Sequence, residues 1–122
     1  MADYDVYIDS TWGGTESGTE AEPYTTLAQI VWATAITSIA AGSDVTVNLA
    51  KGSTFTEALN IGTSGASGRS IIVQAYGSGA DPIINGSGIV NTIDTSGESY
   101  ITINGVNVIN ADSVNVLSLI HI

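Results

Sequence analysis

Apolar and polar residues alternate with a period of two through much of the second half of the chain. Three segments share this alternation position by position: Asp44–Leu49, Ser70–Ala75 and Tyr100–Gly105. Such alternation is typical of a β-strand with one buried face. Corresponding positions are 26 residues apart (Val47 to Val73) and 30 residues apart (Val73 to Ile103), a spacing typical of repeat proteins. We therefore predict parallel strands in which each repeat packs against the next.

An amide side chain follows the central apolar residue of each aligned segment, at Asn48, Gln74 and Asn104. Two interpretations are open. The amides form a ladder that stabilises stacked parallel strands, or they form an outward polar row that contacts a glycan. Tyr76 and Tyr100 fall at outward positions and would add the aromatic surface that sugar contact requires. These five residues are the candidate carbohydrate-binding site.

Short apolar runs lie between the aligned segments, and Gly-rich corners separate them. The runs are Ala58–Ile61, Pro82–Asn85, Ile89–Asp94, Val106–Asn110 and Ser113–Leu117. Each repeat is therefore expected to contain two or three strands. An antiparallel sandwich would instead show tight hairpins, and the Asn-Gly dipeptides do not join two strands in that manner.

A helix is predicted between Thr26 and Gly42. Thr26 and Gln29 have the spacing of a capping box, and Gly42 is suited to a left-handed C-terminal stop. The apolar positions expected on one face are Leu27, Ile30, Val31 and Ala35. Trp32, Ile36 and Ile39 widen this apolar face. So little of this helix is polar that it must cover an apolar surface.

The chain begins with an alternating run, Tyr4–Asp9, which predicts a short strand, and continues with a loop, Ser10–Glu22. The carboxylates in and beside this loop are those of Asp9, Glu16, Glu20 and Glu22. They could supply oxygens to Ca²⁺, but their spacing does not match a loop that wraps the ion. The alternative is an acidic loop that faces water.

The charge balance limits the partners. Twelve acidic residues oppose two basic ones, which gives a formal net charge of −10. The resulting field repels nucleic acids and anionic membranes, so we expect neither as a partner. It also opposes polyanionic sugars unless a bound cation neutralises them, whereas a neutral polysaccharide meets no such penalty. The absence of cysteine excludes disulfides and thiolate metal sites.

Several motifs in order resemble the N-terminal part of right-handed parallel β-helix proteins of the pectate-lyase-like superfamily. They are Tyr7–Ser10, Gly18–Leu27, the helix that follows, Gly42–Val47 and Gly52–Glu57. The resemblance covers most of the chain, with Phe55 standing where the family usually has Tyr. It implies an all-β fold, a right-handed parallel β-helix (solenoid) with an N-terminal strand and capping α-helix, about three coils long and truncated.

This interpretation divides the chain into three parts. Residues 1–43 are expected to form the N-terminal cap, residues 44–116 the coils, and residues 117–122 a non-native tail. The tail sequence is the translation of CTGTCTCTTATACACATC, which matches a transposon-end adapter used in sequencing libraries. We hypothesise that the natural chain stops near Val116. The last coil then ends without a polar cap, and its open strand edges favour self-association.

No set of residues predicts catalysis by the chain itself. A lyase would need a base to abstract a proton, and only Lys51 and Arg69 could serve, both in corners where a solvated base is the ordinary explanation. A hydrolase would need several carboxylates gathered on one face, and nothing places Asp81, Asp94 and Asp112 together. No catalytic residue, metal site or cofactor is therefore assigned, although the resemblance permits Ca²⁺ in the full-length parent.

Two functions remain open. The first is an N-terminal fragment of a carbohydrate-binding or polysaccharide-degrading β-helix protein, with a scaffold role. The second is a structural or adhesin protein, such as a phage tail spike or a bacterial surface protein. Residues 1–7 lack the basic and apolar regions of a secretory signal, and no apolar run reaches about 18 residues. We expect the parent to be extracellular or to lie on a virion or cell surface.

Overall fold

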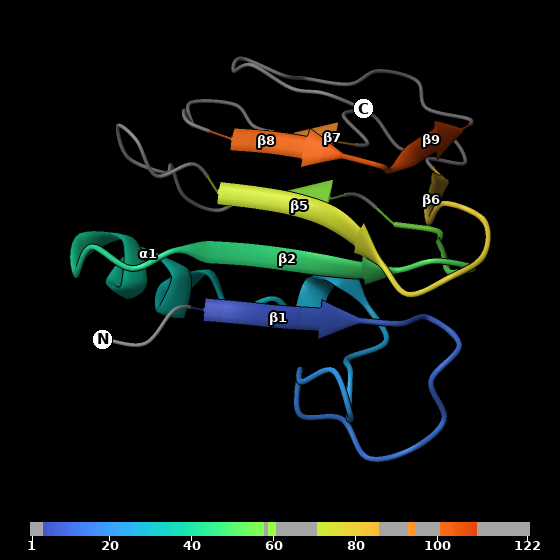
Figure 1. Cartoon of the computed structure of the whole chain (residues 1–122), viewed down its shortest axis with the longest axis horizontal. Helices are drawn as coiled ribbons and strands as arrows, with labels where there is room; N and C mark the ends of the chain where they lie inside the picture. Colours follow the sequence, from blue (N-terminus) through green and yellow to red (C-terminus); the bar gives the residue numbers. More distant parts are fainter. Residues whose placement is uncertain (1–3, 58, 61–70, 86–92, 95–100, 110–122) are drawn as a thin grey trace.

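The computed structural model of the chain describes residues 4–57, 59–60, 71–85, 93–94 and 101–109. The helical elements are η1 (Leu27–Gln29), a 3₁₀ turn, and α1 (Trp32–Ala40). The strands are β1 (Tyr4–Ile8), β2 (Val45–Ala50), β3 (Thr54–Phe55), β4 (Leu59–Asn60), β5 (Ile71–Tyr76), β6 (Ile83–Asn85), β7 (Ile93–Asp94), β8 (Ile101–Asn104) and β9 (Asn107–Ile109). Figure 1 shows them as stacked layers, with α1 at the level of β1 and β2.

All strand pairs among the described residues are parallel. The largest sheet has the order β1-β2-β5-β8, and two smaller sheets have the orders β3-β6-β9 and β4-β7. In the four-stranded sheet Val47 pairs with Val73, and Val73 pairs with Ile103. The register predicted from the alternation is therefore confirmed. β1 extends the same register by one strand, because Val6 pairs with Val47.

The predicted fold class, an all-β right-handed parallel β-helix, is wrong. Within the described residues the chain forms a small mixed α/β fold, in which parallel sheets pack with one helix and no coil closes into a solenoid. Alternation predicts which strands pair, but parallel pairing does not specify how sheets connect into a ring. In addition, Leu27, Ile30 and Ala35 belong to the same core as the strands, so the helical segment contributes to the packing of the fold.

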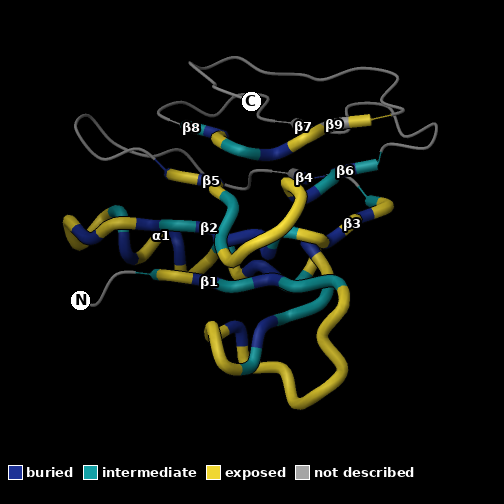
Figure 2. Tube along the Cα trace, turned by 45° about the vertical axis from the view of Figure 1, so that its right-hand side comes forward, coloured by how far each residue is buried: buried dark blue, intermediate teal, exposed yellow. Residues whose placement is uncertain are grey.

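One hydrophobic core lies behind the four-stranded sheet. Alternate residues of β1, β2 and β5 point into it and are fully buried, and Phe55, Leu59 and Ile84 of the smaller sheets join them. Figure 2 shows this burial concentrated where the sheets face one another. Because every second residue points inward, the intervening residues of these strands lie on the outer face of the sheet.

The predicted single helix is divided into two pieces. After η1, Ile30 is extended, with φ −61° and ψ 128°, and α1 begins only at Trp32. The Val31 N–H donates to the Tyr4 hydroxyl at 2.9 Å instead of to a helical carbonyl. The break turns Ile30 into the core and leaves Val31 42% and Ile36 50% exposed, so the predicted buried face is wrong at both.

The predicted C-terminal stop of the helix is confirmed. Gly42 has φ +86°, its N–H donates to Ile39 O at 3.1 Å, and the Ser43 N–H donates to Ser38 O at 2.8 Å. This pair of bonds is the Schellman arrangement, which satisfies carbonyl groups at the end of a helix. The left-handed conformation it requires is one that glycine adopts at little cost.

The other predicted strands are present where the structure describes them. β4, β6, β7 and β9 fall within the apolar runs 58–61, 82–85, 89–94 and 106–110, and β1 covers most of Tyr4–Asp9. The loop after β1 returns to the free edge of this strand, because Tyr7 N–H donates to Gly18 O and Tyr24 N–H donates to Tyr7 O, both at 2.9 Å. Residues 113–122, including the hypothesised tail, lie outside the described residues.

Candidate functional site

The outer face of the four-stranded sheet carries a row of polar and aromatic side chains. Tyr7, Asn48, Gln74 and Asn104 are aligned across β1, β2, β5 and β8 by the strand register. Tyr76 lies two residues beyond Gln74 on β5, on the same face. We refer to these five residues as the outer strip. Sequence analysis predicted four of them; the fifth candidate, Tyr100, lies outside the described residues.

The amides of Asn48 and Gln74 form a ladder across the sheet. Asn48 Nδ2 donates to Val6 O at 3.2 Å, and Gln74 Nε2 donates to Asn48 Oδ1 at 3.0 Å. Asn48 is only 4% exposed, so both ends of its amide are engaged within the protein. Gln74 and Asn104 are exposed residues. Asn48 therefore positions the strip, while its neighbours form the accessible surface.

Tyr7 and Tyr76 meet edge to face on this surface. Their ring centroids are 5.0 Å apart and their planes are at 89°. The two residues stand on β1 and β5, which flank β2, and the outer-face residues of β2 at this point, Asn48 and Ala50, are 4% and 5% exposed. The rings therefore cover β2. Both tyrosines remain partly exposed, so the pair offers an aromatic surface to a ligand.

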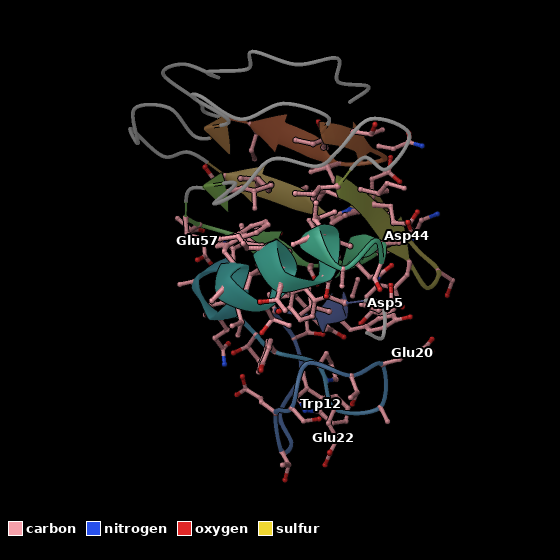
Figure 3. All side chains as sticks on the ribbon, turned by 90° about the vertical axis from the view of Figure 1, so that its left-hand side faces the viewer. Asp5, Trp12, Glu20, Glu22, Asp44 and Glu57 are labelled. Atoms are coloured by element: carbon pink, nitrogen blue, oxygen red, sulfur yellow. The ribbon has the colours of Figure 1, made fainter. Side chains whose placement is uncertain are left out.

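The electrostatic environment of Tyr76 is negative. Partial burial, followed by the carboxylates of Asp9 and Glu20 and by Tyr7, raises the pKa of Tyr76 to about 12. The phenol is therefore protonated at neutral pH and can both donate and accept a hydrogen bond. Figure 3 places Glu20 and Asp5 on one side of the molecule, opposite Glu57.

Asp9 is fixed at the end of β1 by a hydrogen-bond network. Its Oδ1 accepts from Thr11 N at 2.9 Å, Thr11 Oγ1 at 2.7 Å and Ser53 Oγ at 3.3 Å. Ser53 Oγ also accepts from Ser10 N at 3.1 Å, and Ser10 Oγ accepts from Thr54 N at 3.0 Å. These bonds tie the start of the acidic loop to the β2-β3 turn and hold the Asp9 carboxylate beside the strip.

The loop carboxylates considered for Ca²⁺ are separately engaged. Glu16 Oε1 accepts from Thr25 Oγ1 at 3.2 Å and from Gln29 Nε2 at 3.0 Å, while Glu22 Oε1 accepts from Ser17 Oγ at 3.3 Å. Figure 3 shows Glu20 and Glu22 on this loop together with Trp12. Within the described residues, no group of three or more His, Asp or Glu side chains is arranged to hold a metal ion.

Of the two bases considered for catalysis, Lys51 lies among the described residues and Arg69 does not. Lys51 is half-buried in the turn after β2, where its backbone N–H donates to the backbone carbonyl of Tyr76 at 2.9 Å. Arg69, Asp112 and the histidine at position 121 lie outside the described residues, and Asp81 is exposed in the turn before β6.

Tyr7 is the member of the strip that sequence analysis missed. The signal was present: Tyr4–Ile8 has the same alternation as Val45–Leu49, and aligning the two places Tyr7 opposite Asn48. The predicted repeat comprises only the three later segments, so β1 lies outside it. Including it would have placed an aromatic side chain in the amide row.

No protein-family model matches this chain, and neither the curated proteins nor the solved structures include a significant match. The resemblance to pectate-lyase-like proteins therefore stays a prediction. Among the described residues, no helix has the length and apolar character needed to cross a membrane.

Proposed function

We propose that the chain is a carbohydrate-binding scaffold that holds a polysaccharide against the outer face of the four-stranded sheet. The observation that carries the proposal is the partly exposed Tyr7–Tyr76 pair on the same sheet face as the exposed residues Gln74 and Asn104. The role is binding, and no catalytic residue is assigned.

The chemistry of the outer strip suits a sugar ring. An aromatic face accepts the apolar C–H surface of a pyranose, and the phenol and amide groups donate to and accept from its hydroxyls. Binding sites commonly combine such apolar surface with a few fixed polar groups. The Asn48–Gln74 hydrogen bond at 3.0 Å restricts the Gln74 side chain, which lowers the entropy lost when a ligand binds.

The extended geometry favours a chain over a single sugar. Tyr7, Gln74 and Asn104 stand on three strands of one sheet, and neighbouring strands are about 4.8 Å apart. The strip therefore runs across the strands for several sugar lengths. A polysaccharide laid along it would contact the tyrosines at one end and Asn104 at the other.

A structural or adhesin protein is the second candidate. It is favoured by the burial of Asn48, whose amide is fully engaged by Val6 O and Gln74. In that interpretation the tyrosine pair serves only to cover β2. The two candidates differ in what Tyr76 does: it contacts the ligand in the first and contributes only to packing in the second.

Oligosaccharide binding by the full chain tests the proposal. Wild type, Tyr76→Ala and the control Ile36→Ala are compared on a glycan array and then by calorimetry, with folding checked by circular dichroism. Ile36 is an exposed apolar residue on α1, away from the strip. Tyr76→Ala should weaken binding by about fivefold or more, since an aromatic contact contributes about 1 kcal/mol. If no glycan binds wild type, or if Tyr76→Ala binds normally, the proposal fails.

A further inference from the structure

We infer that the outer strip selects its ligand by charge, taking glycans without carboxylates and discriminating against uronate polymers through Asp9 and Glu20. This inference rests on the proposed function, because it names the ligand class of the same strip. It adds two specificity-determining residues, neither of which belongs to the strip itself.

The charged side chain that the strands of the strip place on its outer face is negative. β1, β2, β5 and β8 contain no lysine or arginine, while β1 contributes the exposed Asp5 to the outer face. Asp9 follows β1 on the same face, and Glu20 lies on the same side of the molecule as Asp5 (Figure 3). A uronate laid on the strip would therefore bring its carboxylate to a face that already carries negative charge.

The field of Asp9 and Glu20 reaches the ligand-binding ring. Both carboxylates act on the Tyr76 hydroxyl, adding to the effect of burial on its pKa. A negative group that disfavours phenolate at this position also disfavours a sugar carboxylate stacked beside it. A neutral hydroxyl meets no such repulsion and can donate to the same carboxylates.

The nearby lysine does not reverse this balance. Lys51 lies in the turn after β2, where its backbone N–H donates to Tyr76 O at 2.9 Å. One half-buried cation at the end of the strip is opposed by Asp5, Asp9 and Glu20. The net charge of the whole chain, −10, acts in the same direction.

Asp9 and Glu20 can be neutralised without removing their shape. In Asp9→Asn the side-chain oxygen can still accept from Thr11 and Ser53, so the network at the end of β1 is retained. Glu20 is exposed, and Glu20→Gln leaves its size unchanged. Glu22→Gln is the matched control, because Glu22 lies on the same loop and its oxygen bonds Ser17.

The experiment compares a uronic acid oligosaccharide with its fully methyl-esterified form and with a neutral hexose oligosaccharide of equal length, at low salt and in EDTA. Wild type should bind the ester and the neutral sugar at least about fivefold more tightly than the acid. The Asp9→Asn/Glu20→Gln double variant should lose most of this ratio by gaining affinity for the acid. Added salt should lower the ratio of the wild-type affinity for the ester to its affinity for the acid, because salt screens the repulsion.

The outcomes separate the two proposals. If the acid binds wild type as tightly as its ester, or if the double variant keeps the wild-type ratio, charge selection is overturned while glycan binding stands. The same holds if Glu22→Gln changes the ratio as much as the double variant does. If none of the three oligosaccharides binds wild type, the proposed function is overturned and charge selection with it.

Discussion

The Glu57 carboxylate accepts a hydrogen bond from the backbone N–H of Leu27, with 3.0 Å between Oε2 and N. Its other oxygen accepts from Ala28 N at 3.3 Å. These N–H groups begin η1, where no preceding carbonyl is available to them. A residue after β3 thus caps the 3₁₀ turn that leads into α1, which links the segment after β3 to the start of the helical segment.

Removing this carboxylate should destabilise the fold. Glu57→Ala leaves both N–H groups without their partner, and we expect the free energy of unfolding to fall by about 1 to 2 kcal/mol. Urea denaturation followed by circular dichroism measures the change. Glu20→Ala is the control, because Glu20 is exposed, and its effect should stay within about 0.5 kcal/mol. Equal stability of the two variants would contradict the capping role.

The amide ladder should contribute to stability unequally at its two members. Asn48→Ala removes a buried amide together with its bonds to Val6 O and to Gln74, so we expect a loss of about 2 kcal/mol. Gln74→Ala removes an exposed side chain and should cost less than about 1 kcal/mol. A double-mutant cycle from denaturation curves measures the coupling, expected near 0.5 to 1 kcal/mol. A coupling free energy of zero would show that the Asn48 and Gln74 side chains do not stabilise one another.

Two glycines with the same backbone conformation allow the packing of the loop against β1 to be measured. Gly18 and Gly52 have φ +83° and +86°, so alanine is strained at both. A Cβ at Gly18 would lie 2.6 Å from Tyr24 Cε2, whereas a Cβ at Gly52 would meet nothing within 4 Å. The Tyr24 backbone is fixed by its bonds to Tyr7 and Asp9.

Gly18→Ala should therefore be the more destabilising variant. We expect it to lose at least about 1 kcal/mol more than Gly52→Ala, because only the first adds an overpacked contact to the backbone strain. Thermal unfolding of both variants measures the difference. Equal losses would mean that the Tyr24 ring moves aside without cost.

The strand register could be predicted from sequence because it depends on a local pattern. A one-residue slip would turn Val47, Val73 and Ile103 outward, so the alternation alone specifies the pairing. The helix end at Gly42 was predictable for the same reason, since a left-handed stop is a property of a single residue.

The break before α1 and the fold class could not be predicted in this way. The Val31 N–H leaves the helical pattern because the Tyr4 hydroxyl is available to it, and that partner lies 27 residues earlier. The fold class depends on how the sheets are joined and on the share of the core taken by Leu27, Ile30 and Ala35. Neither follows from the period of a strand, so the resemblance led to a β-helix, whereas the described residues form a small mixed α/β fold.

The candidate site was predictable in its members but not in their roles. Alternation places Asn48, Gln74 and Asn104 on one face. Only the structure brings the Tyr7 and Tyr76 rings together over β2 and buries Asn48 beneath them. Two amides of the same row therefore have different roles. Asn48 on β2 is buried and positions its neighbours, whereas Gln74 on β5 is exposed.

The environment of Tyr76 makes a prediction about alkaline pH. Burial first, then Asp9, Glu20 and Tyr7, raise its pKa to about 12, above the ordinary value of 10. The folded state holds the phenol proton more tightly than the unfolded state, so this contribution to stability is complete below pH 10. It is lost as the pH rises from 10 toward 12.

Absorbance at 295 nm should accordingly show a tyrosine that ionises near pH 12 in the folded protein and near pH 10 in urea. Tyr76→Phe should remove this late step, while the step of Tyr4, whose pKa is also raised by burial, should remain. In Asp9→Asn the late step should move to lower pH, because one of the carboxylates that oppose phenolate is gone. If Asp9→Asn leaves the late step unchanged, the Asp9 carboxylate does not act on the Tyr76 hydroxyl. That result would contradict the electrostatic effect on which the proposed ligand selection depends.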